Sequence, residues 1–304
     1  MEQATNALWA IDPFDTDKTP TPESIDFARA HLGGSFVNTT PLFVCGPHFS
    51  EVLMPLERVR HYLQEFSTGP IRTPEIIRTT SEKKSEWVEE VLKAAKEKNS
   101  QLIILTNHGR RGLSKFLVGS FAESLLEISP LPVLLLGQEV AEDSRKDRAL
   151  FATDFSSESR EAFFEFIRFL APSFKELLLY HAVAMPSGAV VANQLGGAPF
   201  YFSPELWLEQ VNWAKSESKN WLSQIKQMDL PRSLHIHTVI QEAFGDPGPA
   251  ILKLAEREGI SLIGMNSHGK KQHSFFFSSV TKDVLSSDQA EVWACGPQFG
   301  SSFH

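Results

Sequence analysis

The stretch TNHGRRGLSKFLVGS, which runs from Thr106 to Ser120, combines residue types that bind phosphate. It contains three glycines and four basic or histidine residues. Glycine lets a backbone approach an anion closely, and the start of a helix directs free N–H groups and the positive end of its dipole at the same anion. Arg110, Arg111 and Lys115 would add positive charge. One interpretation of the stretch is therefore a phosphate-binding loop.

The same stretch also has a purely structural interpretation. It follows the apolar run QLIIL and precedes SFAESLLE, so it can be a loop that only joins a strand to a helix. Ser120 and Glu123 have the spacing of a capping box, which begins a helix without any ligand. The strict fingerprints GxxxxGK[ST] and GxGxxG are both absent. The spacing alone leaves the two interpretations open.

An altered copy of this stretch occurs later in the chain, as part of an internal repeat. ALWAIDPF at residues 7–14 resembles ALFATDFS at residues 149–156, and KEKNSQLIILTNHGRR resembles REGISLIGMNSHGKK in the same order. The polar segment GQEVAEDSRKDR lies between the copies as a linker would. The repeat predicts two domains, residues 1–140 and residues 141–304.

Short apolar runs alternate with segments of helical period in each copy. This alternation predicts the α/β class, with two tandem Rossmann-like domains that each hold a five-stranded parallel sheet with helices on both faces. The predicted strands are residues 7–11, 35–44, 75–78, 102–105 and 132–136 in the first copy, and residues 149–153, 176–183, 234–240, 261–265 and 291–294 in the second. The predicted helices of the first copy are residues 22–32, 50–66, 81–99 and 120–128.

The end of the first predicted strand carries a further candidate ligand residue. In open parallel sheets, ligands bind beyond the carboxyl ends of the strands, where the strand order reverses. That rule places Asp12 beside the loop that begins at Thr106. Asp12 and its counterpart Asp154 also have a structural interpretation, because an aspartate that follows a strand can cap the next helix.

At these residues the chain resembles the universal stress protein (UspA) family, and the resemblance covers nearly the whole chain as two tandem copies. Nucleotide-binding members of that family have a loop after the fourth strand with the pattern glycine, two residues, glycine, nine residues, glycine, then serine or threonine. The matching positions in the first copy are Thr106, which replaces the first glycine, and Gly109, Gly119 and Ser120. The family's aspartate that contacts adenine matches Asp12, and its apolar contact near the end of the second strand matches Val44.

The resemblance implies an adenine nucleotide alpha hydrolase-like fold and a regulatory role in the stress response. It implies ATP or a related adenine nucleotide in the N-terminal half, together with Mg²⁺, and at most slow ATP hydrolysis. Thr106 is the departure in this half. A β-branched side chain at that position would crowd the phosphates or force a backbone torsion that only glycine adopts easily.

The second copy departs further from the family pattern and predicts a degenerate site. Its matching positions are Asp154, Asn266, Gly269, Ser278 and Ser279, so that two of three glycines are lost, and the spacer is one residue shorter. Three adjacent phenylalanines at residues 275–277 are suited to filling a pocket or an interface. The alternative function is therefore a stress protein that binds no nucleotide and acts through a protein partner or an apolar ligand held by the C-terminal half.

Composition and the remaining motifs narrow the function classes. A net charge of −8 argues against general nucleic-acid binding, and no apolar run is long enough to span a membrane. Without a secretory signal, the expected location is the cytoplasm, with Cys45 and Cys295 as buried thiols. His108 and His268 have no neighbours at metal-ligand spacing, and no catalytic residue or metal site is predicted. The signatures of adenylating ligases are absent, which disfavours an enzyme of that class.

Two architectural expectations complete the prediction. The second copy carries 114 positions between its landmark aspartate and histidine, against 96 in the first. We assign this difference to an insertion near residues 182–205. Family members pair through their last strands, so the resemblance predicts an intramolecular pseudo-dimer that joins residues 132–136 to residues 291–294. It leaves open a homodimer of two chains and unknown protein partners.

Overall fold

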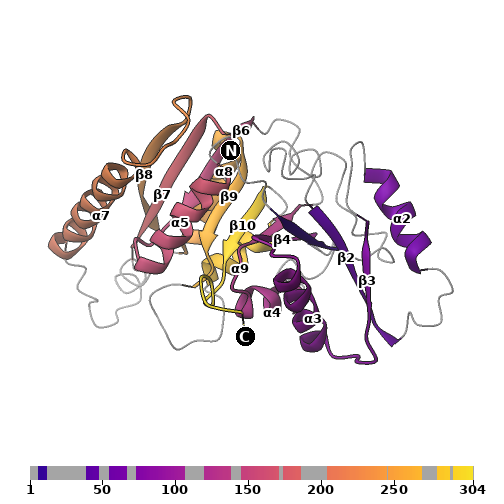
Figure 1. Cartoon of the computed structure of the whole chain (residues 1–304). Helices are drawn as coiled ribbons and strands as arrows, with labels where there is room; N and C mark the ends of the chain where they lie inside the picture. Colours follow the sequence, from indigo (N-terminus) through magenta and orange to yellow (C-terminus); the bar gives the residue numbers. More distant parts are fainter. Residues whose placement is uncertain are drawn as a thin grey trace, which may run out of the picture.

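Figure 1 shows the computed structural model of the chain, in which strands form one continuous sheet across the molecule. The structure describes residues 6–11, 39–47, 55–66, 73–106, 120–137, 145–170, 174–185, 204–244, 246–268, 279–287 and 290–303. Within this part of the chain, the sheet has ten strands in the order β3-β2-β1-β4-β5-β10-β9-β6-β7-β8. The strands are β1 (Ala7–Ala10), β2 (Thr39–Cys45), β3 (Glu75–Arg78), β4 (Leu102–Thr106), β5 (Val133–Leu136), β6 (Arg145–Ala152), β7 (Glu176–Met185), β8 (His235–Phe244), β9 (Ile260–Asn266) and β10 (Glu291–Cys295).

The sheet consists of two parallel halves that have the same internal order. Strands β1–β5 form the first half and strands β6–β10 form the second, and every pairing inside a half is parallel. In each half the first strand lies between the second and the fourth. This order agrees with the predicted α/β class and creates one reversal of strand order per half.

Helices cover both faces of the sheet, because the strands are apolar on both sides. The described helices are α2 (Pro55–Phe66), α3 (Lys84–Glu97), α4 (Ser120–Ile128), α5 (Ser157–Leu170), α7 (Pro204–Ile225), α8 (Pro247–Glu258) and α9 (Ser279–Leu285). One buried cluster joins the sheet to α2, α5 and α7, and a second joins the opposite face to α3, α4, α8 and α9. All four residues of β5 are buried, as expected for a central strand.

Local sequence signals set the ends of α8 clearly. Asp246 is the N-cap residue, and its carboxylate accepts a hydrogen bond from the Gly248 N–H at 3.2 Å. Pro247 follows at the first helical position, where its missing N–H costs nothing. Gly259 ends the helix in the left-handed conformation, with φ of 62°. This end of the helix leads directly into β9.

The two halves meet through an antiparallel pairing of β5 with β10. Leu134 lies opposite Trp293, and Leu135 lies opposite Val292. The N–H of Gly137, just after β5, donates to the carboxylate of the buried Glu291 at the start of β10. The pairing of the last two strands that the sequence predicts is therefore present, and it gives each of them a neighbour on both sides.

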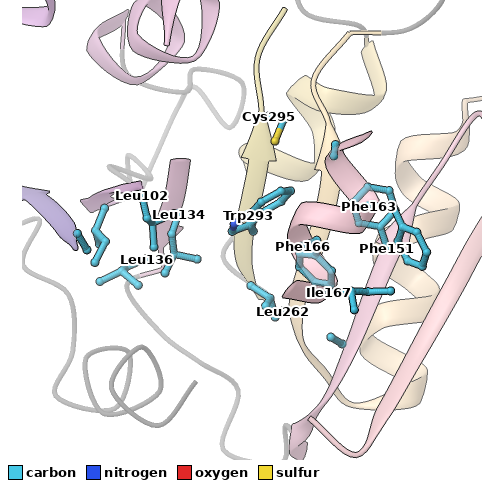
Figure 2. Packing of buried hydrophobic residues seen from close by; sticks show 14 of the residues in the cluster. Leu102, Leu134, Leu136, Phe151, Phe163, Phe166, Ile167, Leu262, Trp293 and Cys295 are labelled. Carbon is cyan, nitrogen blue, oxygen red and sulfur yellow. The ribbon is translucent and has the colours of Figure 1, made fainter. Parts of the chain in front are cut away.

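Hydrophobic packing is continuous across this joint. Figure 2 shows Trp293 between Leu134 of the first half and Phe166 of α5 in the second. The ring centroids of Trp293 and Phe166 are 5.2 Å apart, with the planes at 67°. Both buried clusters contain residues from each half. The halves therefore share their cores and do not merely touch.

All five strands of the second half are longer than the sequence predicts. Strand β6 begins at Arg145, four residues before the predicted start, and Arg145 pairs with Ile260 of β9. The register between the two strands shifts between Arg145 and Ala149. Strands β7 and β8 pair with each other over ten positions, up to Met185 and Phe244. The start of the predicted insertion is thus part of β7 and its end is part of α7, while residues 186–203 lie outside the described residues. None of the described helices is both long and apolar enough to cross a membrane.

Candidate functional site

The strand order of the first half brings the ends of β1 and β4 together. Ala10 lies beside Leu105 in the register of these strands, so Ile11 and Thr106 follow at neighbouring positions. The Ile11 N–H donates to the Leu42 carbonyl on β2 at 2.9 Å, which extends the ladder by one residue. Asp12 comes next in the sequence but lies outside the described residues. The strand order reverses between β1 and β4, and we call this position the switch point of the first half. It lies where the sequence predicts that a ligand binds.

Thr106 is the last residue of strand β4 and does not belong to the loop. It lies opposite Leu136 of β5 in the parallel register. An extended backbone suits a β-branched residue and requires no glycine torsion. The expectation that Thr106 forces a torsion reserved for glycine was therefore wrong, because this position pairs within the sheet.

Ser120 is the first residue of α4, so its backbone N–H belongs to the first turn, where intrahelical acceptors are lacking. In a capping box, Ser120 would be the N-cap residue just before the helix, and not the first residue of the helix.

Val44 is the penultimate residue of β2 and lies two positions beyond Leu42, the residue opposite Ala10. It is partly buried and packs against the core. Gly109 and Gly119 lie outside the described residues.

The corresponding switch point of the second half is formed by β6 and β9, where Ala152 lies beside Met265. Asp154 follows this strand and organises a turn. One of its carboxylate oxygens accepts hydrogen bonds from the Ser156 N–H at 2.9 Å and the Ser156 hydroxyl at 2.6 Å. The Ser156 hydroxyl in turn accepts from the Ser159 N–H at 3.1 Å, in the first turn of α5. Ser156 is thus the residue that caps α5, and Asp154 helps to cap the helix by holding Ser156 in place.

Asn266 likewise uses its side chain within its own turn. It is the last residue of β9 and lies opposite Cys295, as Thr106 lies opposite Leu136 in the first half. Its side-chain amide donates to the His268 carbonyl at 2.8 Å. Ser279 is an exposed residue at the start of α9. The other two predicted positions of this site, Gly269 and Ser278, lie outside the described residues.

Comparison with known proteins identifies the family. A model of the universal stress protein family matches residues 57–137 in the first half and residues 146–295 in the second. These two matches together span well over half of the chain. The chain belongs to the universal stress protein family.

Relatives and solved structures agree with this assignment. Universal stress protein MJ0577 of Methanocaldococcus jannaschii is 27% identical over 150 residues, which cover 48% of this chain and 91% of that protein. A universal stress protein from Archaeoglobus fulgidus has a TM-score of 0.54 and 20% identity, and covers 96% of this chain with 98% of its own. A functionally unknown protein from Pseudomonas aeruginosa has a TM-score of 0.60 and 15% identity, over 97% and 94% of the two chains. The two structures share the fold with this universal stress protein over both halves.

His268 is a hydrogen-bonded histidine after β9 in this universal stress protein. Its Nδ1 lies 2.7 Å from the Ser267 hydroxyl, and burial lowers its pKa below the ordinary value of 6.5. Ser267 is fully buried, and its carbonyl accepts from the Thr281 hydroxyl at 2.8 Å. A nucleophile must reach its substrate, so this serine–histidine contact is structural. Among the described residues, no cluster of metal-ligating side chains occurs.

An aromatic cluster beside the second switch point has no signal in the sequence. Phe155, the residue after Asp154, adopts a positive φ of 56°, which is unfavourable for a bulky residue. Its ring packs 5.1 Å from Trp221 and 5.0 Å from His181, measured between centroids. The His181 Nδ1–H donates to the Thr153 carbonyl at 2.7 Å. Tertiary packing holds Phe155 in this conformation, and sequence patterns cannot report such packing.

Proposed function

We propose that this universal stress protein binds one adenine nucleotide per chain, in its first half, as a regulatory signal in the cytoplasmic stress response. The observation that carries the proposal is the use of two motif side chains of the second half within their own turns. In the second half, the side chains of Asp154 and Asn266 are used in hydrogen bonds within their own turns. The first half retains the switch point and more of the family's loop pattern.

The residues of the first half fit an adenine nucleotide by their chemistry. Asp12 would accept a hydrogen bond from the base, and Val44 would contact it from the end of β2. The backbone of Gly109 and Gly119 would approach the phosphates closely, and the first turn of α4, from Ser120, supplies N–H groups and a favourable dipole. Mg²⁺ would neutralise phosphate charge when bound together with ATP. We propose residues 1–140 as the nucleotide-binding domain and residues 141–304 as its degenerate partner.

The proposed role is regulatory binding, with at most slow hydrolysis. Hydrolysis at a useful rate requires a group that positions or activates the attacking water. The motif positions of the first half offer backbone amides, a serine and an aspartate that the resemblance assigns to the base. We therefore expect the state of bound nucleotide, and not its turnover, to carry the signal to partners.

Native mass spectrometry of the full chain, before and after addition of ATP with Mg²⁺, tests this proposal. We expect one nucleotide per chain, lost on Asp12→Ala with the fold retained. The matched variant of the second half, Asp154→Ala, should keep the nucleotide. Two nucleotides per chain, or none at millimolar ATP, would reject the proposal.

A second candidate function is favoured by the aromatic cluster of the second half. The exposed ring of Trp213 packs 6.0 Å from the buried Phe155 ring and 6.1 Å from His181, measured between centroids, and an exposed ring of this kind suits an apolar ligand or partner. An unexplained mass that co-purifies with the chain and persists in Asp12→Ala would support this alternative. Its loss in Phe155→Ala would locate it in the second half.

A further inference from the structure

Residues 296–303 follow β10 and extend from the second half onto helices of the first. We refer to residues 296–303 as the C-terminal segment. Figure 1 shows the C-terminus beside α4 and α3, far from α7 and β8 of its own half. Backbone hydrogen bonds from Phe299 to the Gly296 carbonyl at 3.1 Å and from Ser301 to the Gln298 carbonyl at 3.0 Å give the segment a folded path.

The segment contacts the carboxyl-terminal end of α4 through backbone atoms. A Cβ atom built on Gly296 would lie 1.7 Å from the Leu126 carbonyl oxygen, so only glycine permits this approach. The Gly300 N–H donates to the Pro130 carbonyl at 3.1 Å, just after the helix. Gly300 has a φ of 78°, a conformation that glycine adopts without strain. Two glycines thus fit the segment against the end of α4.

A further contact reaches the neighbouring helix α3. The Lys96 ammonium donates to the Phe303 carbonyl at 3.2 Å. The Phe303 side chain packs against the buried cluster that contains α3 and α4, whereas Phe299 packs against the cluster on the opposite face of the sheet. The segment is therefore fastened at Gly296, Gly300 and Phe303, and two of its rings join different core clusters.

We infer that the C-terminal segment of the second half is a positioning element for the nucleotide site of the first half. This inference rests on the proposed function for its ligand. Helix α4 has nine residues, and its amino-terminal residue Ser120 is the one that ends the family's phosphate-loop pattern. A short helix moves as a rigid body, so contacts at Leu126 and Pro130 fix the direction of the N–H groups at Ser120. The second half, although degenerate, thereby sets the geometry of the site in the first.

The test uses two variants of the full chain and measures α4 with and without nucleotide. Gly296→Ala introduces the Cβ that meets the Leu126 carbonyl, and the double variant Lys96→Met with Phe303→Ala removes the contact to α3. Phe163→Leu, a core change in α5 of the second half, is the control for a general loss of stability. We expect faster amide hydrogen exchange in α4 and about tenfold weaker ATP binding in both test variants, a typical coupling between distant sites. The control should change neither quantity.

The outcomes separate this inference from the proposed function. Unchanged exchange in α4 in both test variants would overturn the role of the segment, whatever the nucleotide does. Faster exchange with unchanged ATP affinity would show that the segment holds the helix but does not position the site, which also overturns the inference. Absence of ATP binding in the parent chain would overturn the proposed function, and exchange in α4 would still report whether the segment holds the helix.

Discussion

At the residue scale, Asp154 stabilises the turn that precedes α5. Its carboxylate holds the turn before α5, and the Ser156 hydroxyl completes the cap. We predict that Asp154→Ala lowers the free energy of unfolding by about 1 kcal/mol, because it removes the hydrogen bonds that hold Ser156 in its capping position. Urea denaturation of the full chain measures this. Asp154→Asn retains an acceptor oxygen and should cost much less, and an equal loss in both variants would contradict the capping role.

Asp283 makes the stability of the protein depend on pH in the direction opposite to that of most carboxylates. Burial, and then the nearby charge of Asp246, raise its pKa above the ordinary value of 3.8. The crowding is visible at Gly248, where an added Cβ would lie 2.5 Å from a carboxylate oxygen of Asp283. A raised pKa in the folded state means that this group's contribution to stability is complete below pH 3.8 and is lost as the pH rises through the raised value.

We therefore predict that Asp283→Asn stabilises the protein at pH 7 and that the gain disappears as the pH is lowered toward 4. The neutral amide removes the cost of a charged carboxylate in this position while keeping its size. Urea midpoints at several pH values measure the difference. Glu256→Gln on the exposed side of α8 is the matched control, and a gain that does not depend on pH would exclude the proposed cause.

At the scale of single elements, the position of Thr106 at the end of β4 determines what its replacement of the family's glycine changes. Because Thr106 pairs with Leu136 inside the sheet, its backbone requires no glycine torsion. We expect crowding of the phosphates by a β-branched residue to be the remaining effect. We predict that Thr106→Ala and Thr106→Gly both strengthen ATP binding. Thr106→Gly should also lose roughly 1 kcal/mol of stability, because glycine is unfavourable in a strand. Isothermal titration measures the affinity for ATP, and urea denaturation measures the stability. Stronger ATP binding in Thr106→Gly alone would show that this position requires a backbone torsion that favours glycine.

Most elements were predictable from sequence because their apolar periodicity is strong. Strand β3 and helix α4 have the predicted bounds, since turn residues and a polar segment limit them sharply. Strands β6 and β8 were predicted too short because several of their extra residues, such as Arg145 and Glu242, are charged. Cross-strand pairing includes these residues in the sheet. The cap role of Asp154 was among the stated alternatives. The positive φ of Phe155 and the contacts of the C-terminal segment were not, since both depend on tertiary packing.

At the scale of the whole molecule, the shared sheet and shared cores favour one unfolding unit. Both buried clusters include residues from each half, and Trp293 packs on Phe166 while lying opposite Leu134. We predict a single unfolding transition in urea, with coincident curves from circular dichroism and tryptophan fluorescence. Trp293→Ala should destabilise the chain by about 3–5 kcal/mol. Two resolved transitions in the parent chain would show instead that the halves unfold independently.

Because β5 and β10 pair within one chain, the association of the two halves does not depend on the concentration of the protein. A dimer of separate chains dissociates on dilution, whereas strands on one chain meet at an effective concentration fixed by the covalent connection. The ratio of the two halves is therefore one to one in every molecule, at any level of expression. Because each of these strands already has a neighbour on both sides, they are also closed to exchange with single-domain relatives. Joining the halves thus keeps their partnership independent of dilution and of competing chains.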